Sequence, residues 1–218
     1  MPANPLTPDP SPCEGGDRLP ALRLVVGLGN PGPQYADTRH NAGFWLADEL
    51  ARQHGGHFRP ESKYHGETCR IALAGQELWL LKPMTFMNRS GLAVAALARF
   101  HRIPLPAILV VHDDLDLPLG VARLKRAGGH GGHNGLRDLI SHLGDNDFLR
   151  MRLGIGHPGD SRDVLDYVLC RAPAAERALV EQAIGDALRE LPRLAAGQWD
   201  RAVHALHSRR VESSSKPS

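Results

Sequence analysis

The sequence contains only three cysteines among its 218 residues, and no long hydrophobic run. The cysteines, Cys13, Cys69 and Cys170, are odd in number, far apart and in no C-x-x-C pair. A disulfide framework and a thiolate zinc site are therefore not indicated, and a reducing compartment fits this use of cysteine.

No stretch approaches the ~20 apolar residues that a membrane span needs. Residues 1–20 also lack the basic start and apolar stretch of a signal peptide. We therefore expect a cytoplasmic protein without membrane contact. Residues 1–20 and the polar residues 208–218 show no periodicity, which predicts two disordered tails around one domain over residues 21–207.

The sequence also lacks a large excess of either sign of charge, because its formal net charge is only +2. Overall charge therefore neither requires nor excludes a polyanionic partner. The 42% hydrophobic and 23% charged content is ordinary for a globular protein.

Short apolar runs alternate with segments of helical periodicity. The expected strands are Leu22–Val26, Glu67–Ala74, Glu77–Leu81, Ala107–Val111, Val121–Arg126 and Phe148–Ile155. The expected helices are Ala42–Gln53, Gly91–His101, Leu136–Leu143, Asp163–Leu169, Ala174–Ala196 and Trp199–Leu206. This order predicts an α/β fold: a single domain with a mixed, largely parallel twisted sheet flanked by helices on both faces. Functional loops should lie at the carboxyl ends of its strands.

The first such loop reads GLGNPG over residues 27–32, a literal G-x-G-x-x-G. In a dinucleotide-binding protein a helix starts inside this motif, whereas here Pro31 and Pro33 flank Gly32 and the helix starts only near Ala42. A tight turn is the alternative, and it leaves Asn30 as a polar group at a strand end.

The segment TRHNAG (38–43) places His40 just before a helix, where a lone histidine would be interpreted as a capping or packing residue. The loop HDDLD (112–116) presents Asp113 at the end of a hydrophobic strand. A carboxylate there could orient an imidazole, so that His40 and Asp113 would form a general base that activates water. A solvated acidic turn is the alternative for the aspartates. No nucleophile motif of the G-x-S-x-G type is present.

The loop AGGHGGHNG (127–135) contains His130, His133 and Asn134, and its glycines would allow close backbone contact with a ligand. A flexible link is the simpler interpretation. These histidines with His112 and the aspartates could also form a metal site, although no H-E-x-x-H motif is present. Around this loop lie Arg123, Lys125, Arg126, Arg137, Arg150 and Arg152, which suggest phosphate contacts or a solvated basic face.

A fourth loop, KPMTFMNRSG (82–91), follows a strand and contains Phe86, Met87 and Asn88. An exposed aromatic ring there could stack on a nucleic-acid base, and Asn88 could donate to a carbonyl or cap the next helix.

Five motifs together, GLGNPGPQYADTRHNAG, KPMTFMN, HDDLDLPLG, GGHGGHNGL and RLGIGHPG, resemble the bacterial-type peptidyl-tRNA hydrolase family in their order and content. The resemblance extends from about Leu22 to His207 and makes residues 21–207 a catalytic domain. It implies hydrolysis of the ester between a peptide and the 3′ ribose of tRNA, which recycles peptidyl-tRNA from stalled ribosomes. It also implies a monomer without metal or other cofactor.

The resemblance assigns a role to each matching residue. His40 would be the base for water, Asp113 its orienting carboxylate, and Asn30 the residue that selects peptidyl over free aminoacyl esters. The tRNA end or the peptide would be bound by Tyr35, Phe86, Asn88 and Asn134, with Met87 and His133 lining the cleft. The tRNA 5′-phosphate would be bound by Lys125 and Arg152. A non-catalytic RNA-binding module and an NAD-type oxidoreductase are the alternatives from other functional classes.

Overall fold

The computed structural model describes residues 19–209. The other parts of the two predicted tails, residues 1–18 and 210–218, lie outside the described residues. Beside them, Leu19 packs in the hydrophobic core and Arg209 donates hydrogen bonds to helix α5 (Ala174–Ala195). The boundaries of the tails stay a prediction.

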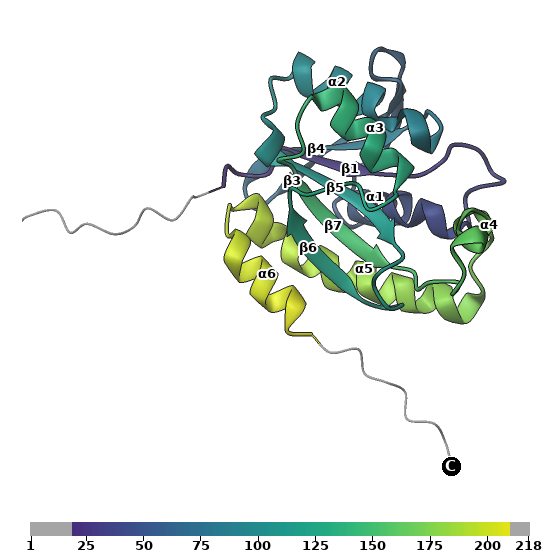
Figure 1. Ribbon diagram of the computed structural model, residues 1–218. Helices are drawn as coiled ribbons and strands as arrows, with labels where there is room; N and C mark the ends of the chain where they lie inside the picture. Colours follow the sequence, from purple (N-terminus) through teal and green to yellow (C-terminus); the bar gives the residue numbers. More distant parts are fainter. Residues whose placement is uncertain (1–18, 210–218) are drawn as a thin grey trace, which may run out of the picture.

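A seven-stranded sheet in the order β2-β3-β4-β1-β5-β7-β6 forms the centre of the described chain (Figure 1). Four neighbouring strands are parallel: β4 (Gln76–Pro83), β1 (Leu24–Gly27), β5 (Ile108–Asp114) and β7 (Leu149–Gly154). Antiparallel pairings extend the sheet at both edges through β2 (Arg59–Glu61), β3 (Gly66–Leu73) and β6 (Ala122–Arg126). The predicted α/β class with a mixed sheet is confirmed.

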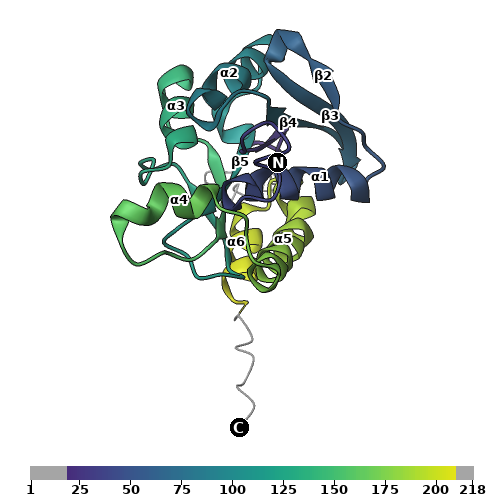
Figure 2. The same ribbon diagram turned by 90° about the vertical axis from the view of Figure 1, so that its right-hand side faces the viewer.

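Helices cover both faces of the sheet (Figures 1 and 2). One face carries α1 (Ala42–Gln53), α5 (Ala174–Ala195) and α6 (Trp199–His207), and the other carries α2 (Ser90–Phe100) and α3 (Asn134–Leu143). The short helix α4 (Val164–Leu169) contacts the 3₁₀ turn Arg39–Asn41, which precedes α1. Within residues 19–209, no helix combines the length and the apolar character of a membrane span.

Strand β1 shows why the central strands are apolar throughout. Leu24 and Val26 pack into the core beneath α2 and α3, whereas Val25 points into the core beneath α1 and α5. Because both faces are covered, neither set of side chains reaches solvent, and the polar alternation of a half-exposed strand is absent.

Two elements differ from the sequence-based expectation. The edge strand β2 was not predicted, because its residues are polar and include Pro60, which leaves no apolar alternation. Strand β5 continues beyond Val111 to Asp114, and Asp113 pairs with Leu153 of β7. Asp113 therefore lies on the strand and not just past its end, since hydrogen bonds to β7 extend β5 through its polar residues.

The glycines of G-x-G-x-x-G allow close packing of β1 against the start of α1. A Cβ atom on Gly27 would lie 2.3 Å from the carbonyl oxygen of Gly43, and one on Gly43 would lie 2.4 Å from the backbone nitrogen of Leu28. The two backbones are thus in direct contact. This packing accounts for Gly27 without a nucleotide and brings the His40 turn to the end of the sheet.

Candidate active site

His40 lies in the 3₁₀ turn before α1, and neighbouring elements fix this turn in place. The backbone N–H of Arg39 donates to the carbonyl of Cys170, just after α4, at 3.3 Å. The buried Arg39 guanidinium also donates to Glu176 at 2.8 Å and to the Tyr167 carbonyl at 3.0 Å. The position of His40 therefore depends on α4 and α5 as well as on its own helix.

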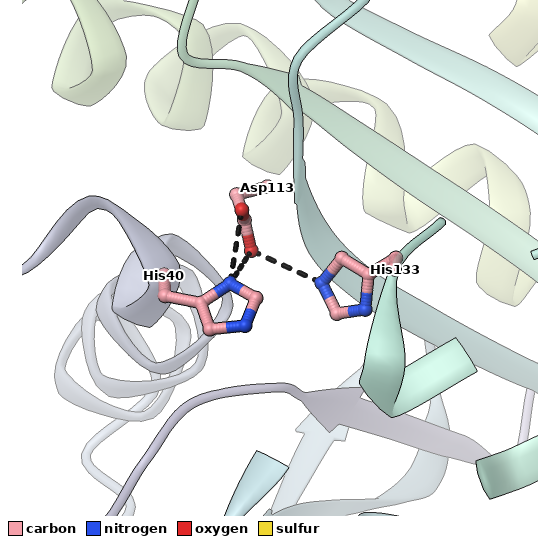
Figure 3. A group of neighbouring side chains, drawn as sticks. All are labelled: His40, Asp113 and His133. Atoms are coloured by element: carbon pink, nitrogen blue, oxygen red, sulfur yellow. Dashed lines mark hydrogen bonds and ion pairs between the residues drawn. The ribbon is translucent and has the colours of Figure 1, made fainter. Parts of the chain in front are cut away.

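His40 and Asp113, which are 73 positions apart in the chain, are in direct contact (Figure 3). The Nδ1 atom of His40 lies 2.9 Å and 3.0 Å from the two carboxylate oxygens of Asp113. Among the described residues, Nε2 of His40 has no hydrogen-bond partner, so this nitrogen can accept a proton from a bound molecule. Both side chains are buried, with residue exposures of 8% for His40 and 3% for Asp113.

His133 also contacts Asp113 and lies to the right of His40 in Figure 3. Its Nε2 lies 3.1 Å from Asp113 Oδ1, and its Nδ1 accepts hydrogen bonds from the backbone N–H groups of Gly135 and Leu136. His133 thus caps α3 with Nδ1, which places its proton on Nε2, the nitrogen that faces Asp113. One carboxylate therefore accepts hydrogen bonds from two histidines.

Opposing effects set the ionisation of this group. Burial lowers the pKa of His40, but the charge of Asp113 and its hydrogen bond have the larger effect and raise that pKa above its usual value. Burial also favours the neutral form of Asp113, but His40 and His133 together hold its pKa well below the usual range. Asp113 is therefore ionised at neutral pH, and His40 is a stronger base than a free imidazole.

His112 is a third imidazole beside Asp113. Its Nδ1 donates to the backbone carbonyl of Asp113 at 2.7 Å, and its ring packs edge-on against His133 with centroids 5.1 Å apart. Burial, with the neighbouring His133, holds the pKa of His112 well below its usual range. His112 is therefore a neutral packing residue next to the reactive pair.

Asn30 is held by two neighbours. Asn41 accepts from the Asn30 backbone N–H at 2.8 Å and donates to its carbonyl at 2.9 Å, while the backbone N–H of Met87 donates to Asn30 Oδ1 at 2.7 Å. Because Oδ1 is already used, the Nδ2 amide group remains as a donor without a partner in the described part of the chain. Asn41 was not singled out from the sequence, although it stands next to His40.

The loop after β4 lies close to the glycine loop. A Cβ atom on Gly135 would lie 2.6 Å from Met87 Sδ and 3.1 Å from His133 Cε1, so Met87 and His133 flank this glycine. Phe86 is 56% exposed, and its ring makes an edge contact with Tyr35 at 6.3 Å between centroids. The structure thus places the exposed Phe86 and the half-buried Tyr35 near the buried polar group.

The remaining predicted site residues are exposed or line a cavity. Asn88 and Asn134 are exposed at the starts of the 3₁₀ turn before α2 and of α3. A cavity of about 530 Å³ adjoins His40 and Asp113, and Asn134, Lys125 and Arg152 line it.

The cavity has two walls of different character. Its basic wall comes from the ends of β6 and β7 and the glycine loop, and contains Lys125 and Arg152. Arg152 donates from Nε to Asp114 at 2.6 Å, which leaves its other N–H groups available. Helix α4 also lines the cavity, and its Val164 and Leu165 provide apolar surface. This combination suits a ligand with both phosphates and apolar parts.

His40, Asp113 and His133 also have the spacing of metal ligands, because one ligand atom from each lies within 4.8 Å of the others. Histidine and carboxylate suit zinc. However, the cap on α3 places a proton on the His133 nitrogen that faces Asp113, and a metal ligand needs a free lone pair there. His130, which the sequence also offered as a metal ligand, accepts a hydrogen bond at Nδ1 from the backbone N–H of Gly132. The donor set fits proton transfer better than metal binding.

Fold and site together define an α/β protein with a buried His–Asp pair at the mouth of a basic cavity. The sequence profile described as "Peptidyl-tRNA hydrolase" matches residues 24–214. A protein of this name from Halorhodospira halophila is 57% identical over 187 residues, which are 86% of this chain and 96% of that protein. Another from Pseudomonas syringae pv. tomato is 54% identical over 194 residues, which are 88% and 100% of the two chains.

Solved structures agree with these relatives. The crystal structure of peptidyl-tRNA hydrolase from Acinetobacter baumannii is similar with a TM-score of 0.86 and 45% identity, and the match covers 89% of this chain and 99% of that one. The chain belongs to the peptidyl-tRNA hydrolase family. The family resemblance inferred from the five motifs is confirmed.

Proposed function

We propose that this protein hydrolyses the ester bond between a peptide and the 3′ ribose of tRNA. The observation that carries the proposal is His40, whose Nδ1 is bound to the ionised Asp113 while Nε2 has no partner in residues 19–209. A histidine held in this way is a general base for water. Family membership supplies the substrate class.

The reaction follows from the geometry. Nε2 of His40 takes a proton from water as the water oxygen attacks the ester carbonyl carbon, and Asp113 stabilises the resulting imidazolium. The tetrahedral intermediate then collapses, the bond to the ribose oxygen breaks, and the imidazolium returns the proton to that oxygen. The products are a peptide carboxylate and tRNA with a free 3′-hydroxyl group.

Binding is assigned to the surrounding residues. The free Nδ2 of Asn30 is placed to donate to a carbonyl of the peptide, which would favour peptidyl over free aminoacyl esters. Tyr35 and Phe86 offer aromatic surface for the tRNA end or the peptide. Asn88 and Asn134 provide exposed amides next to Met87 and His133, which both flank Gly135.

The 5′-phosphate of the tRNA is assigned to Lys125 and Arg152. Their basic cavity wall supports this role, because phosphate contacts position an RNA without reading its sequence. We also expect a monomer that acts in the cytoplasm without metal or other cofactor.

The purified protein should release N-acetylated amino acid from N-acetyl-aminoacyl-tRNA in the presence of chelator. His40→Ala should reduce kcat by about 10²- to 10⁴-fold, because the general base is lost. The affinity for tRNA should remain within a few-fold of the original. His54→Ala provides a matched control, since His54 is exposed at the end of α1.

Two results would contradict the proposal. If the unmodified protein releases no N-acetylated amino acid, the proposed esterase activity is wrong. If the His40→Ala and unmodified proteins react at equal rates, His40 is not the general base. RNA binding without hydrolysis would favour the alternative of a non-catalytic RNA-binding module.

A further inference from the structure

Arg150 on β7 is a buried cation without an acidic partner. Its residue exposure is 2%, and none of the ion pairs that the structure gives for residues 19–209 includes it. Its guanidinium instead donates to two successive backbone carbonyls, from Nη1 to Gly129 at 2.6 Å and from Nη2 to Gly128. A buried charge is costly without such hydrogen bonds, so the contact is a specific feature of this site.

The carbonyls that Arg150 binds belong to the glycine loop between β6 and α3. Ala127, Gly128, Gly131 and Gly132 all have positive φ, at 56°, 98°, 55° and 81°. A Cβ atom on Gly131 or Gly132 would meet no neighbour within 4 Å, so packing does not restrain that part of the loop. A glycine-rich segment of this kind loses much conformational entropy when it is ordered, and the bonds from Arg150 restrain its first half.

The same loop ends at His133. At this end, the His133 backbone N–H donates to the carbonyl of His130, and the His133 side chain caps α3 and contacts Asp113 at 3.1 Å. A continuous set of contacts therefore runs from Arg150 through the loop to the carboxylate that orients His40.

We propose that Arg150 is a positioning residue that holds the glycine loop so that His133 remains hydrogen-bonded to Asp113, and thereby sets the basicity of His40. The role differs from that assigned to Lys125 and Arg152. Lys125 is exposed, whereas the terminal nitrogens of Arg150 are already bound to carbonyls within the fold.

The proposal predicts a direction for the pKa of His40. If the loop moves, Asp113 loses the donor His133 and interacts more strongly with His40, so the pKa of His40 should rise by roughly half a pH unit. The other titratable and charged groups around this carboxylate, His112 and the pair of Asp114 and Arg152, are not substituted in any of the variants.

The experiment is an NMR titration of the His40 ring in Arg150→Met, His133→Ala and the double variant. We expect the pKa to rise in each single variant and to rise no further in the double variant, because Arg150 acts through His133. Arg150→Lys retains the charge and one donor, so it should give a smaller shift. Arg102→Met is the control, since Arg102 is exposed after α2 and should leave the titration unchanged.

An unchanged pKa of His40 in a folded Arg150→Met protein would overturn the proposal, and so would shifts that add in the double variant. If Arg150→Met does not fold, the same two outcomes apply to Arg150→Lys. The effect on catalysis rests on the proposed function, whereas the titration does not use enzyme activity. Failure of the esterase assay is therefore distinguishable from failure of this inference.

Discussion

The Asp113 carboxylate is buried and hydrogen-bonded within the fold, whereas the basic and aromatic groups nearby are exposed and have few partners. The Asp113 carboxylate accepts from both His40 and His133. Lys125 has no hydrogen-bond or ion-pair partner among residues 19–209, and Phe86 is 56% exposed. The contacts of Asp113 are formed before any substrate arrives, whereas the exposed groups would find their partners on the substrate.

This difference has a physical reason. A base must keep one orientation and one ionisation state in both free and bound protein, and burial with fixed partners achieves this. The phosphate groups and nucleobases of a bound RNA bring their own charge and stacking surface. Unpaired cations and exposed aromatic rings on the protein are suited to bind them. Changes at the centre should therefore affect kcat, and changes at the surface should affect KM.

The strongest test of the comparison is Asp113→Asn. The amide cannot stabilise an imidazolium, so kcat should fall by about 10²- to 10³-fold with little change in KM. Because Asp113 raises the pKa of His40, its loss should lower that pKa, and the acid limb of the kcat profile should move to lower pH. Rates measured from acid to neutral pH test this.

Asp116→Asn is the matched control, because Asp116 is an exposed aspartate three positions further along the chain. An unaltered pH profile for Asp113→Asn, with only a loss of stability, would reduce Asp113 to a structural residue.

Lys125→Ala tests the other side of the comparison. We expect KM to rise by roughly 3- to 10-fold with kcat unchanged, because an unpaired surface cation contributes to binding and not to the chemical step. The slope of log KM against log salt concentration should become smaller by about one unit, which corresponds to the loss of one phosphate contact. Lys63→Ala is the control, since Lys63 is paired with Glu61. A fall in kcat for Lys125→Ala would break the division between centre and surface.

The smallest expected effect concerns stability. The pKa of His112 is lowered in the folded protein, so the unfolded chain binds a proton below pH ~6.5 that the folded chain does not. The free energy of unfolding should fall as the pH drops below this value, by at most about 1.4 kcal/mol per pH unit for one proton.

His112→Asn should flatten this slope between pH 6.5 and 5, as measured by urea unfolding. His54→Ala should leave the slope unchanged, because His54 is exposed. An equal slope in the His112→Asn and unmodified proteins would show that His112 does not control acid sensitivity, and that the centre is less isolated from solvent than its burial indicates.

Much of this architecture could be predicted from the sequence, because the central strands are continuous apolar runs and the main helices have clear periodicity. Loop placement also indicated that Asp113 could reach His40, and the two are in contact. The edge strand β2 could not be predicted, since its three residues show no apolar alternation and its strand geometry comes from pairing with β3.

The contacts of His133 and Arg150 also could not be predicted from the sequence. His133 was interpreted as a residue lining the cleft, yet its Nε2 faces Asp113 because Nδ1 is used to cap α3. Arg150 was counted with a basic stretch, although it is buried under the glycine loop. Charge and spacing along the chain do not indicate which cations a fold will bury.

The sequence by itself determined the central strands and main helices, the family, and the loops that carry His40, Asp113 and His133. These depend on local periodicity and on motifs that are contiguous in the chain. Only the tertiary structure decided which nitrogen of each histidine faces Asp113 and that the carboxylate serves two histidines. The reason is that β5 lies between β1 and β7 in the sheet, so groups distant in sequence meet at one strand end, where hydrogen bonds fix each proton.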